Sequence, residues 1–169
     1  YTLATQQGYA EAQLSLALMY EVGRGVPKNA PTALKLFALA AEQGVTLAQY
    51  NMAVAFETGK GAPKDLTLAF EWYRQAAEQG HTQAQYNLGL FYKRGDGAPK
   101  NELMAMKWLT LAAEQGNASA QLNIGLMYED GKGVEENGKI AVHWYTLAAK
   151  QGHAQAQTNL GFMYEDGSG

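Results

Sequence analysis

The feature of this sequence that most constrains its fold is a five-residue motif that returns at a fixed interval. The motif AAEQG ends at Gly44, Gly80 and Gly116, and the near copy AAKQG ends at Gly152, so that each glycine follows the last by 36 residues. Gly-x-Gly pairs and Ala-Gln pairs recur in the same register, with no insertion. A fixed period of roughly 20 to 50 residues is typical of tandem-repeat proteins. We therefore expect an array of about five copies.

Residues 81–116 indicate what one copy folds into. Apolar residues recur at helical spacing over 82–94, and Gly95 tolerates the positive φ with which a helix commonly ends. Asn101 is a good N-cap for a second helix, which Gly116 ends. Neither helix can bury its apolar face alone, but stacked neighbours can. The fold class expected is all-α: an α-solenoid of helix-turn-helix repeats.

The repeat boundaries follow from the glycine spacing. We expect one array over 1–169, with full repeats at 9–44, 45–80, 81–116 and 117–152 and partial repeats at 1–8 and 153–169. Residues 1–7 are interpreted as the tail of a preceding second helix, and both ends are interpreted as cut from a longer array. Solenoid ends without a polar cap expose apolar surface, so end-to-end self-association of the fragment is expected.

Several repeated residues are predicted to be structural. The alanines of AAEQG allow close approach of helices, and its glycine suits a left-handed backbone. A further small residue recurs in the first helices, where a larger side chain would overpack the contact; its members are Ala17, Ala53, Gly89, Gly125 and Gly161. Trp72, Trp108 and Trp144, one period apart, are predicted to anchor packing rather than to hold a ligand.

Composition argues against several classes of partner. The net charge is -3, which gives no electrostatic reason to bind nucleic acid. No apolar run approaches the roughly 20 residues of a membrane-spanning helix, and no signal peptide is visible, so no membrane insertion is expected. The sequence contains 0 cysteines, which removes disulfides and thiolate metal ligands.

Catalytic motifs are also missing from the sequence. No serine opens an S-x-x-K or lies within a G-x-S-x-G. His81 and His153 occupy equivalent positions two repeats apart, too distant to share a metal ion, and His143 is expected to face solvent. We expect no catalytic residue, no cofactor and no metal site.

The segments ASAQLNIGLMYEDGKG and AVHWYTLAAKQG, at the two ends of 118–152, resemble the Sel1-like repeat (SLR) family, a relative of the tetratricopeptide repeat. The resemblance covers essentially the whole chain. It implies a right-handed superhelix that serves as a non-catalytic adaptor for protein partners, often in the bacterial envelope, in secretion or in host interaction. Periplasmic, envelope or secreted localisation follows by the same resemblance.

The resemblance also supplies an alternative function. Some cysteine-rich members have been described as binding or hydrolysing β-lactams, which implies a binder of β-lactams or peptidoglycan fragments, or a weak hydrolase. This sequence has none of those cysteines. A β-lactam reporter would separate this alternative from the adaptor function.

The candidate binding surface is the concave wall, which the first helix of each repeat lines in solenoids of helical pairs. The packing positions of the first helix repeat from copy to copy, which leaves one variable face. In the third copy this face is formed by Gln83, Tyr86, Asn87, Leu90, Lys93 and Arg94. Variation on one face, beside constancy on the others, is what a binding wall would show.

One position on that face is constant and polar. It carries Asn51, Asn87, Asn123 and Asn159, with Ser15 in the first copy. A ladder of carboxamides can bind the backbone of an extended peptide, as in related tetratricopeptide domains. Alternatively, each asparagine bonds to a neighbouring helix and fixes the stacking of repeats. Both interpretations stay open.

Two tyrosines and a basic spot complete the candidate surface. Tyr50 and Tyr86 offer amphipathic area of the kind enriched at interfaces, although half-buried packing explains them equally well. Lys93 and Arg94 lie between the acidic residues of neighbouring copies. They pair with those residues on the surface, or they hold a carboxylate of a partner. The function predicted is a scaffold that binds a partner protein or peptide.

Overall fold

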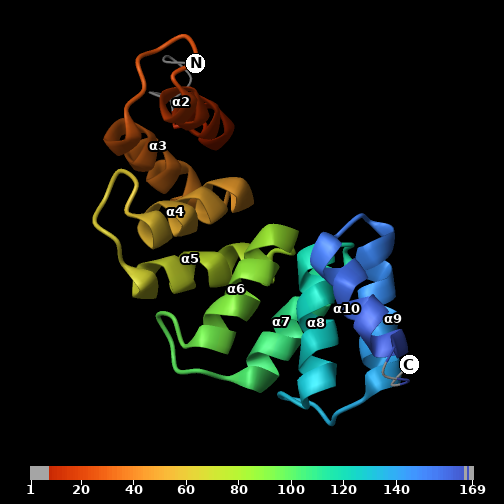
Figure 1. The fold of residues 1–169 in the computed structure, drawn as a ribbon. Helices are drawn as coiled ribbons and strands as arrows, with labels where there is room; N and C mark the ends of the chain where they lie inside the picture. The colour runs from red at the N-terminus through yellow and green to blue at the C-terminus, as the bar shows by residue number, and fades with distance from the viewer. Residues whose placement is uncertain (1–7, 166, 168–169) are drawn as a thin grey trace. The chain divides into compact units, whose positions relative to one another are not determined.

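A computed structural model of the chain describes residues 8–165 and 167. These residues form nine α-helices and no strand, which confirms the all-α expectation (Figure 1). The predicted helix tail at residues 1–7 and most of the terminal Gly-Ser-Gly lie outside the described residues. The helices are α2 (Ala10–Val22), α3 (Ala30–Glu42), α4 (Thr46–Thr58), α5 (Leu66–Glu78), α6 (Thr82–Arg94), α7 (Glu102–Glu114), α8 (Ala118–Asp130), α9 (Gly138–Lys150) and α10 (Ala154–Glu165).

The second helix of each repeat begins at a side-chain cap. Asn101 accepts a hydrogen bond from the backbone N–H of Met104 (3.0 Å), as predicted for an N-cap. The equivalent residues of the other repeats cap their helices in the same way: Asn29, Asp65 and Asn137. The helix starts are therefore encoded locally, by one residue per repeat.

The first helices begin less uniformly. In α8, Asn117 accepts from Ala120 N–H at 2.9 Å. One repeat earlier, the ring nitrogen Nδ1 of His81 accepts from Ala84 N–H at 3.2 Å. Val45, at the same position before α4, provides no side-chain cap. The repeat thus keeps the helix start while its capping chemistry varies.

The loop within each repeat is closed by its backbone. Asn101 N–H donates to the carbonyl of Tyr92 at 2.9 Å, and the same bond recurs in the other three complete loops. In three of the Gly-x-Gly pairs the second glycine, at Gly61, Gly97 and Gly133, lies against the preceding repeat. At Gly61, where φ is +90°, an added Cβ would lie 2.7 Å from the carbonyl oxygen of Ala30. Only glycine fits this combination of positive φ and close approach.

The turn between repeats explains the AAEQG motif. Gly80 has a φ of +85°, and the N–H of His81 donates to the carbonyl of Ala76 at 3.1 Å. This bond, from just past the helix end back to the last turn, belongs to the Schellman type of helix termination. Ala76 and Ala77 are 0% and 1% exposed, so the motif joins close packing to a tight turn, as predicted.

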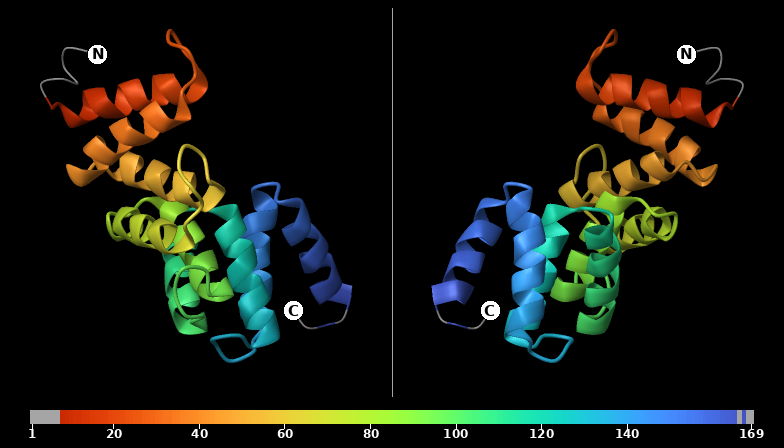
Figure 2. Two further views of the ribbon diagram at one scale, coloured as in Figure 1. Left: turned by 90° about the vertical axis from the view of Figure 1, so that its left-hand side faces the viewer. Right: turned by 90° about the vertical axis from the view of Figure 1, so that its right-hand side faces the viewer.

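The chain divides into two compact units, each with its own core. Unit 1 comprises Tyr1–Ala84 with Asp96–Ala98, and unit 2 comprises Gln85–Gly95 with Pro99–Gly169. The core of unit 1 gathers around Leu14, Phe37 and Met52. Unit 2 has two clusters, one around Leu109 and Ile124 and a second that joins α8, α9 and α10, which lie side by side (Figure 2).

Small residues set the helix spacing inside unit 2. An added Cβ at Gly89 would lie 2.7 Å from Cγ of Leu109, and one at Gly125 would meet the ring of Tyr145. These two contacts confirm the predicted role of the small residue. Gly161, in the last helix, has no atom of the described residues within 4 Å of such a Cβ. Trp108 is 7% exposed and packs as expected.

Candidate protein-interaction surface

The asparagine ladder, Asn51, Asn87, Asn123 and Asn159, lies on the first helices α4, α6, α8 and α10. Two of its members use their amide N–H groups within their own helix. Asn51 Nδ2 donates to Leu47 O at 2.8 Å, and Asn123 Nδ2 donates to Ser119 O at 2.9 Å. These bonds fix the side-chain rotamers and leave the carboxamide oxygens for other donors.

The carboxamide oxygens meet different donors in different repeats. Asn123 Oδ1 accepts from the ammonium of Lys93 on α6 at 2.9 Å. Asn159 Oδ1 accepts from Gln155 of its own helix at 2.8 Å, and the hydroxyl of Tyr145 on α9 also bonds to Asn159. Bonds from neighbouring helices at these two positions favour the packing interpretation there. Asn51 has a bond only within α4 among the described residues.

A row of acidic residues runs beside the ladder, and its partners also vary. The hydroxyl of Tyr73 donates to Glu57 at 2.5 Å, and that of Tyr145 donates to Glu129. Burial and this carboxylate raise the pKa of Tyr145 well above its usual range. In the first repeat, Glu21 instead pairs with Lys60 at 2.8 Å.

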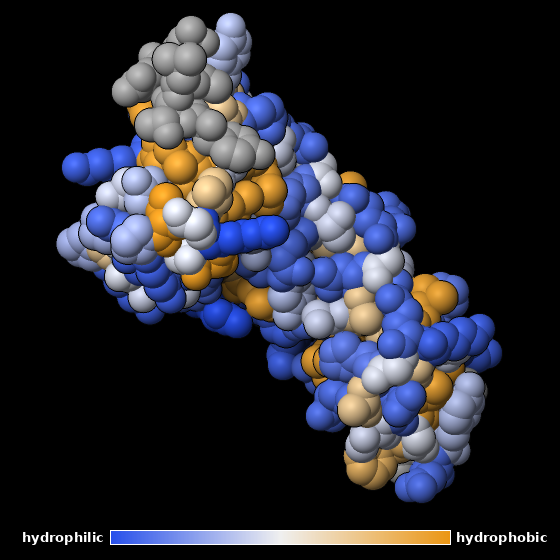
Figure 3. Space-filling view, turned by 90° about the horizontal axis from the view of Figure 1, so that it is seen from above, coloured by the Kyte–Doolittle hydropathy of each residue, from blue (hydrophilic) through white to orange (hydrophobic). Residues whose placement is uncertain are grey.

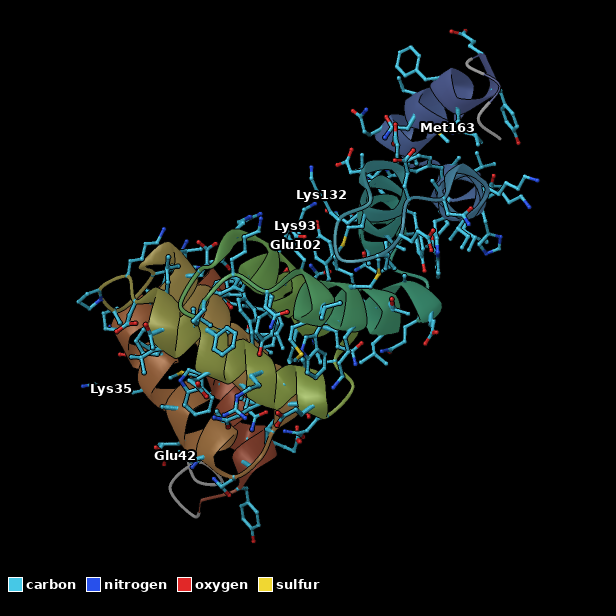
Figure 4. The ribbon with its side chains drawn as sticks, turned by 90° about the horizontal axis from the view of Figure 1, so that it is seen from below. Lys35, Glu42, Lys93, Glu102, Lys132 and Met163 are labelled. Carbon is cyan, nitrogen blue, oxygen red and sulfur yellow. The ribbon has the colours of Figure 1, made fainter. Side chains whose placement is uncertain are left out.

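Lys93 occupies the acidic position in the third repeat and is half-buried. Burial lowers its pKa, and the ammonium of Lys132 lowers it further, while Asp130 acts in the opposite direction. Figure 4 shows Lys93, Glu102 and Lys132 close together in unit 2. Asp130 itself pairs with Lys132 at 2.8 Å. The basic spot is therefore a mixed cluster, in which Lys93 is held by an amide rather than by a carboxylate.

The remaining candidate residues are less exposed than a free surface would require. Tyr50 stacks on His81 with ring centroids 4.6 Å apart, and Tyr86 packs at the edge of a core cluster. Gln83 and Leu90 are half-buried, whereas Arg94 is exposed. Other repeats have a leucine at the position of Tyr50 and Tyr86. These leucines, Leu14 and Leu122, are 8% and 9% exposed. This part of the predicted variable face belongs to the packing, because leucine there is drawn into the core.

The sequence reasoning missed a buried glutamine ladder. The side-chain amide of the glutamine in each AAEQG turn donates to the buried glutamine of the preceding first helix, at 2.6 to 2.8 Å. The four pairs are Gln13–Gln43, Gln49–Gln79, Gln85–Gln115 and Gln121–Gln151. Both glutamines recur with the 36-residue period, and this recurrence is the sequence signal from which the pairs could have been predicted. Their constancy is structural, since a buried amide needs a partner.

Residues 8–165 and 167 contain no group of three His, Cys, Asp or Glu side chains placed to hold a metal ion. Within the same residues, no helix has the length and apolar character needed to cross a bilayer.

These features define the class of the protein: an all-α chain of tandem helix hairpins whose constant residues serve the stacking of repeats. Comparison with protein families identifies it further. The Sel1 repeat model matches residues 10–45, 46–81, 82–117, 118–153 and 154–169, and the chain belongs to the Sel1 repeat family. Sel1 repeats generally mediate protein–protein interactions and are generally non-catalytic scaffolds.

Solved structures agree with this assignment. A protective antigen of uropathogenic Escherichia coli with an SLR fold is 38% identical, with a TM-score of 0.95 over 98% of this chain and 35% of that one. This chain thus spans about a third of that antigen. A Sel1 repeat protein from Oxalobacter formigenes is 39% identical, with a TM-score of 0.92 over 96% of this chain and 67% of that one. Cysteine rich protein B of Helicobacter pylori is 22% identical, with a TM-score of 0.62 over 79% of this chain and 96% of that one. The last is a likeness of fold alone. No curated protein matched the chain.

Proposed function

We propose that this chain is a scaffold that binds a segment of a partner protein along its first helices, on the concave side expected of stacked helical pairs. The observation that carries the proposal is the contrast between the two kinds of position on these helices. The packing residues repeat from copy to copy, whereas the neighbouring acidic position changes to Lys93 and the first-turn position varies through Glu11, Leu47 and Gln83. The packing of the helices does not require different residues at these partly exposed positions.

The asparagine ladder supplies the sequence-independent part of the proposed binding. A carboxamide offers two donors and an acceptor, which suits the N–H and C=O groups of an extended peptide. Asn51 and Asn123 hold fixed rotamers through their bonds to Leu47 and Ser119, and preorganised side chains lose less entropy on binding. The proposal applies to each unit by itself, with Asn51 and Tyr50 in unit 1 and the remaining asparagines in unit 2.

The variable residues supply the proposed selectivity. In unit 2, Lys93 and Arg94 offer positive charge to an acidic group of the partner, and the half-buried Leu90 offers apolar area. Lys93 must leave Asn123 to bind such a group, and its half-burial makes an anionic partner favourable. Binding that depends on this charge weakens as salt is raised.

The test compares two double variants in quantitative capture of proteins from a matched lysate. Asn87→Ala with Asn123→Ala removes two members of the ladder. Lys107→Ala with His143→Ala changes two exposed residues of the second helices and is the matched control. We expect the ladder variant to lose its specific partners and the control variant to retain them.

Circular dichroism and urea unfolding must first show that both variants are folded. Retention of every partner by the folded ladder variant contradicts the proposed role of the asparagines. Loss of partners by the control alone places the binding surface on the second helices. The cell-wall alternative is not supported by any described residue or comparison, and a β-lactam reporter assay remains its direct test.

We also propose that the isolated chain self-associates end to end. The last helix exposes Phe162 and Tyr164 (59% and 62%), and the first described helix follows the exposed Tyr9 and ends at the exposed Val22 (61% and 67%). Hydrophobic surface gathers near the start of the described chain (Figure 3). Exposed apolar patches of this kind favour association. Light scattering that shows a monomer at every concentration would count against this proposal.

A further inference from the structure

A pocket in unit 1 lies where the second and fourth repeats place a tyrosine hydroxyl. Its cavity volume is about 20 Å³, room for a group the size of a hydroxyl, and it opens between α2, α3, α4 and the loop that follows α4. Polar side chains from three of these segments line it, namely Glu21, Asn51 and Lys60. Apolar side chains, among them Leu34, Phe37 and Ala55, form the rest of the lining.

At the equivalent site in the fourth repeat, a tyrosine hydroxyl bonds to the glutamate and the asparagine. There the hydroxyl of Tyr145 donates to Glu129 and also bonds to Asn159 of the next first helix. In the second repeat, Tyr73 donates to Glu57 at 2.5 Å. One hydroxyl thus joins the acidic residue of one repeat to the neighbouring helices.

The first repeat keeps the glutamate and the asparagine and lacks the hydroxyl. Glu21 and Asn51 occupy the positions of Glu129 and Asn159, but the tyrosine position holds Phe37. Phe37 is 3% exposed and the two tyrosines are 0% exposed, so the rings are buried alike. The first repeat therefore lacks the phenolic hydroxyl, and the next helix also holds the small Ala55 where the tyrosine-bearing repeats are followed by Phe91 and Met163, so a pocket opens there.

The third repeat has no tyrosine at this position, and another side chain bonds to its asparagine. Its position holds Leu109, and the ammonium of Lys93 reaches Asn123 directly at 2.9 Å. In the first repeat Lys60 takes one oxygen of Glu21, with side chains that are 45% and 25% exposed. The side-chain amide of Asn51 donates to the carbonyl of Leu47, and no bond to Asn51 Oδ1 is found among the described residues. Acceptor capacity therefore remains on both Glu21 and Asn51.

We propose that this pocket receives the hydroxyl of a serine or threonine from the bound partner segment. Such a group would donate to Glu21 or Asn51 in place of the missing phenolic hydroxyl. A carboxylate would meet the charge of Glu21, and an ammonium would duplicate Lys60. An aromatic ring would compete with Phe37 for the same space. The inference rests on the proposed function, since it names the side chain by which a partner is selected in unit 1.

The test uses two isosteric probes and needs no identified partner. N-acetyl-threonine methylamide carries the hydroxyl, and N-acetyl-valine methylamide replaces it by a methyl group. Each is titrated into the full 169-residue chain, and the side-chain amide signals of Asn51 are followed by NMR, assigned by their loss in Asn51→Asp. We expect the threonine probe to bind roughly three to ten times more tightly, which is the usual worth of one hydrogen bond.

Phe37→Tyr is the decisive variant, because it supplies the hydroxyl from within the chain. We expect it to abolish the preference for the threonine probe, while Phe37→Leu preserves it. Equal binding of both probes, no binding of either, or an unchanged preference in folded Phe37→Tyr overturns the inference. Tighter binding of methylammonium than of the threonine probe overturns it as well. These outcomes leave the asparagine ladder test unaffected, so the two proposals fail separately.

Discussion

Replacing Gly125 by alanine tests whether helix spacing, rather than helix propensity, fixes this glycine. Gly125 lies in the middle of α8 and faces Tyr145 of α9, which is 0% exposed. An added Cβ would lie 2.5 Å from Cδ1 and 3.0 Å from Cζ of that ring. The ring cannot easily swing away, because its hydroxyl is bonded to Glu129. The two helices must therefore move apart.

Two opposing terms set the size of the effect. Alanine in a helix interior is favoured over glycine by about 1 kcal/mol. Overpacking a buried contact costs about 1 to 3 kcal/mol. Their sum predicts that Gly125→Ala lowers the free energy of unfolding by about 0 to 2 kcal/mol. The variant should still fold, since Ala53 occupies this position opposite Tyr73 in the second repeat.

Gly161→Ala is the matched control at the same position of the last repeat. No described atom lies within 4 Å of its added Cβ, so only the gain in helix propensity, at most about 1 kcal/mol, remains. The two variants should differ by roughly 1 to 3 kcal/mol in urea unfolding, or by several degrees in Tm for a chain of this size. Equal stabilisation by both substitutions would refute the reasoning, because the clash would then have no energetic weight.

Three further predictions concern groups with defined partners. Gln121→Leu should lower the free energy of unfolding by about 1 to 3 kcal/mol in urea titrations, since it removes the two hydrogen bonds of this buried side chain, to Ala113 and Gln151, whereas Gln157→Leu in the exposed last helix should have a much smaller effect. Burial and a carboxylate raise the pKa of Tyr145 above its unfolded value of about 10, so its contribution to stability is present below that pH and is lost as pH rises further. Tyr145→Phe should therefore show a shallower decline in urea midpoint above about pH 10 than the parent chain. Burial lowers the pKa of His81, whose Nδ1 must be unprotonated to cap α6, so this cap stabilises above about pH 6.5 and is lost as pH falls through the lowered value. His81→Asn should keep the cap and remove that acid sensitivity. Thermal unfolding of both proteins at pH 7 and at about pH 5 measures the effect. An equal loss of stability in the two proteins would contradict this role of His81.

The helix limits could be predicted closely because single residues, the N-caps and the terminating glycines, determine where each helix begins and ends. The first helix expected over 82–94 is α6, and Asn101 begins the second as expected. Positive φ at Gly95 and Gly116, at +81° and +87°, needs no knowledge of the rest of the molecule. Such local signals are repeated in every copy, so an error in one copy would have been visible against the others.

The candidate surface was harder to predict, because partners depend on distances between helices. Lys93 was expected to pair with acidic neighbours or with a partner, and it donates to Asn123 instead. Leu14 and Leu122 share a repeat position with Tyr50, yet the leucines are buried while Tyr50 stacks at the edge on His81. Helical periodicity identifies a face, but it does not say how far the next helix covers it. The binding role of the asparagine ladder stays a prediction for this reason.

The repeats themselves provide an internal series of substitutions at one buried position. Phe37, Tyr73, Leu109 and Tyr145 occupy it in successive copies, within the same helix hairpin. Where tyrosine is present, its hydroxyl satisfies a carboxylate; where leucine is present, Lys93 reaches the asparagine directly. With phenylalanine the carboxylate and the asparagine persist, and a small space remains beside Ala55, where the other repeats place Phe91, Met127 or Met163. Stacking alone would favour closing that space, as the other three repeats do, because filled and bonded positions are more stable. We therefore propose that recognition, rather than packing, accounts for this open position, and the Phe37→Tyr variant tests it.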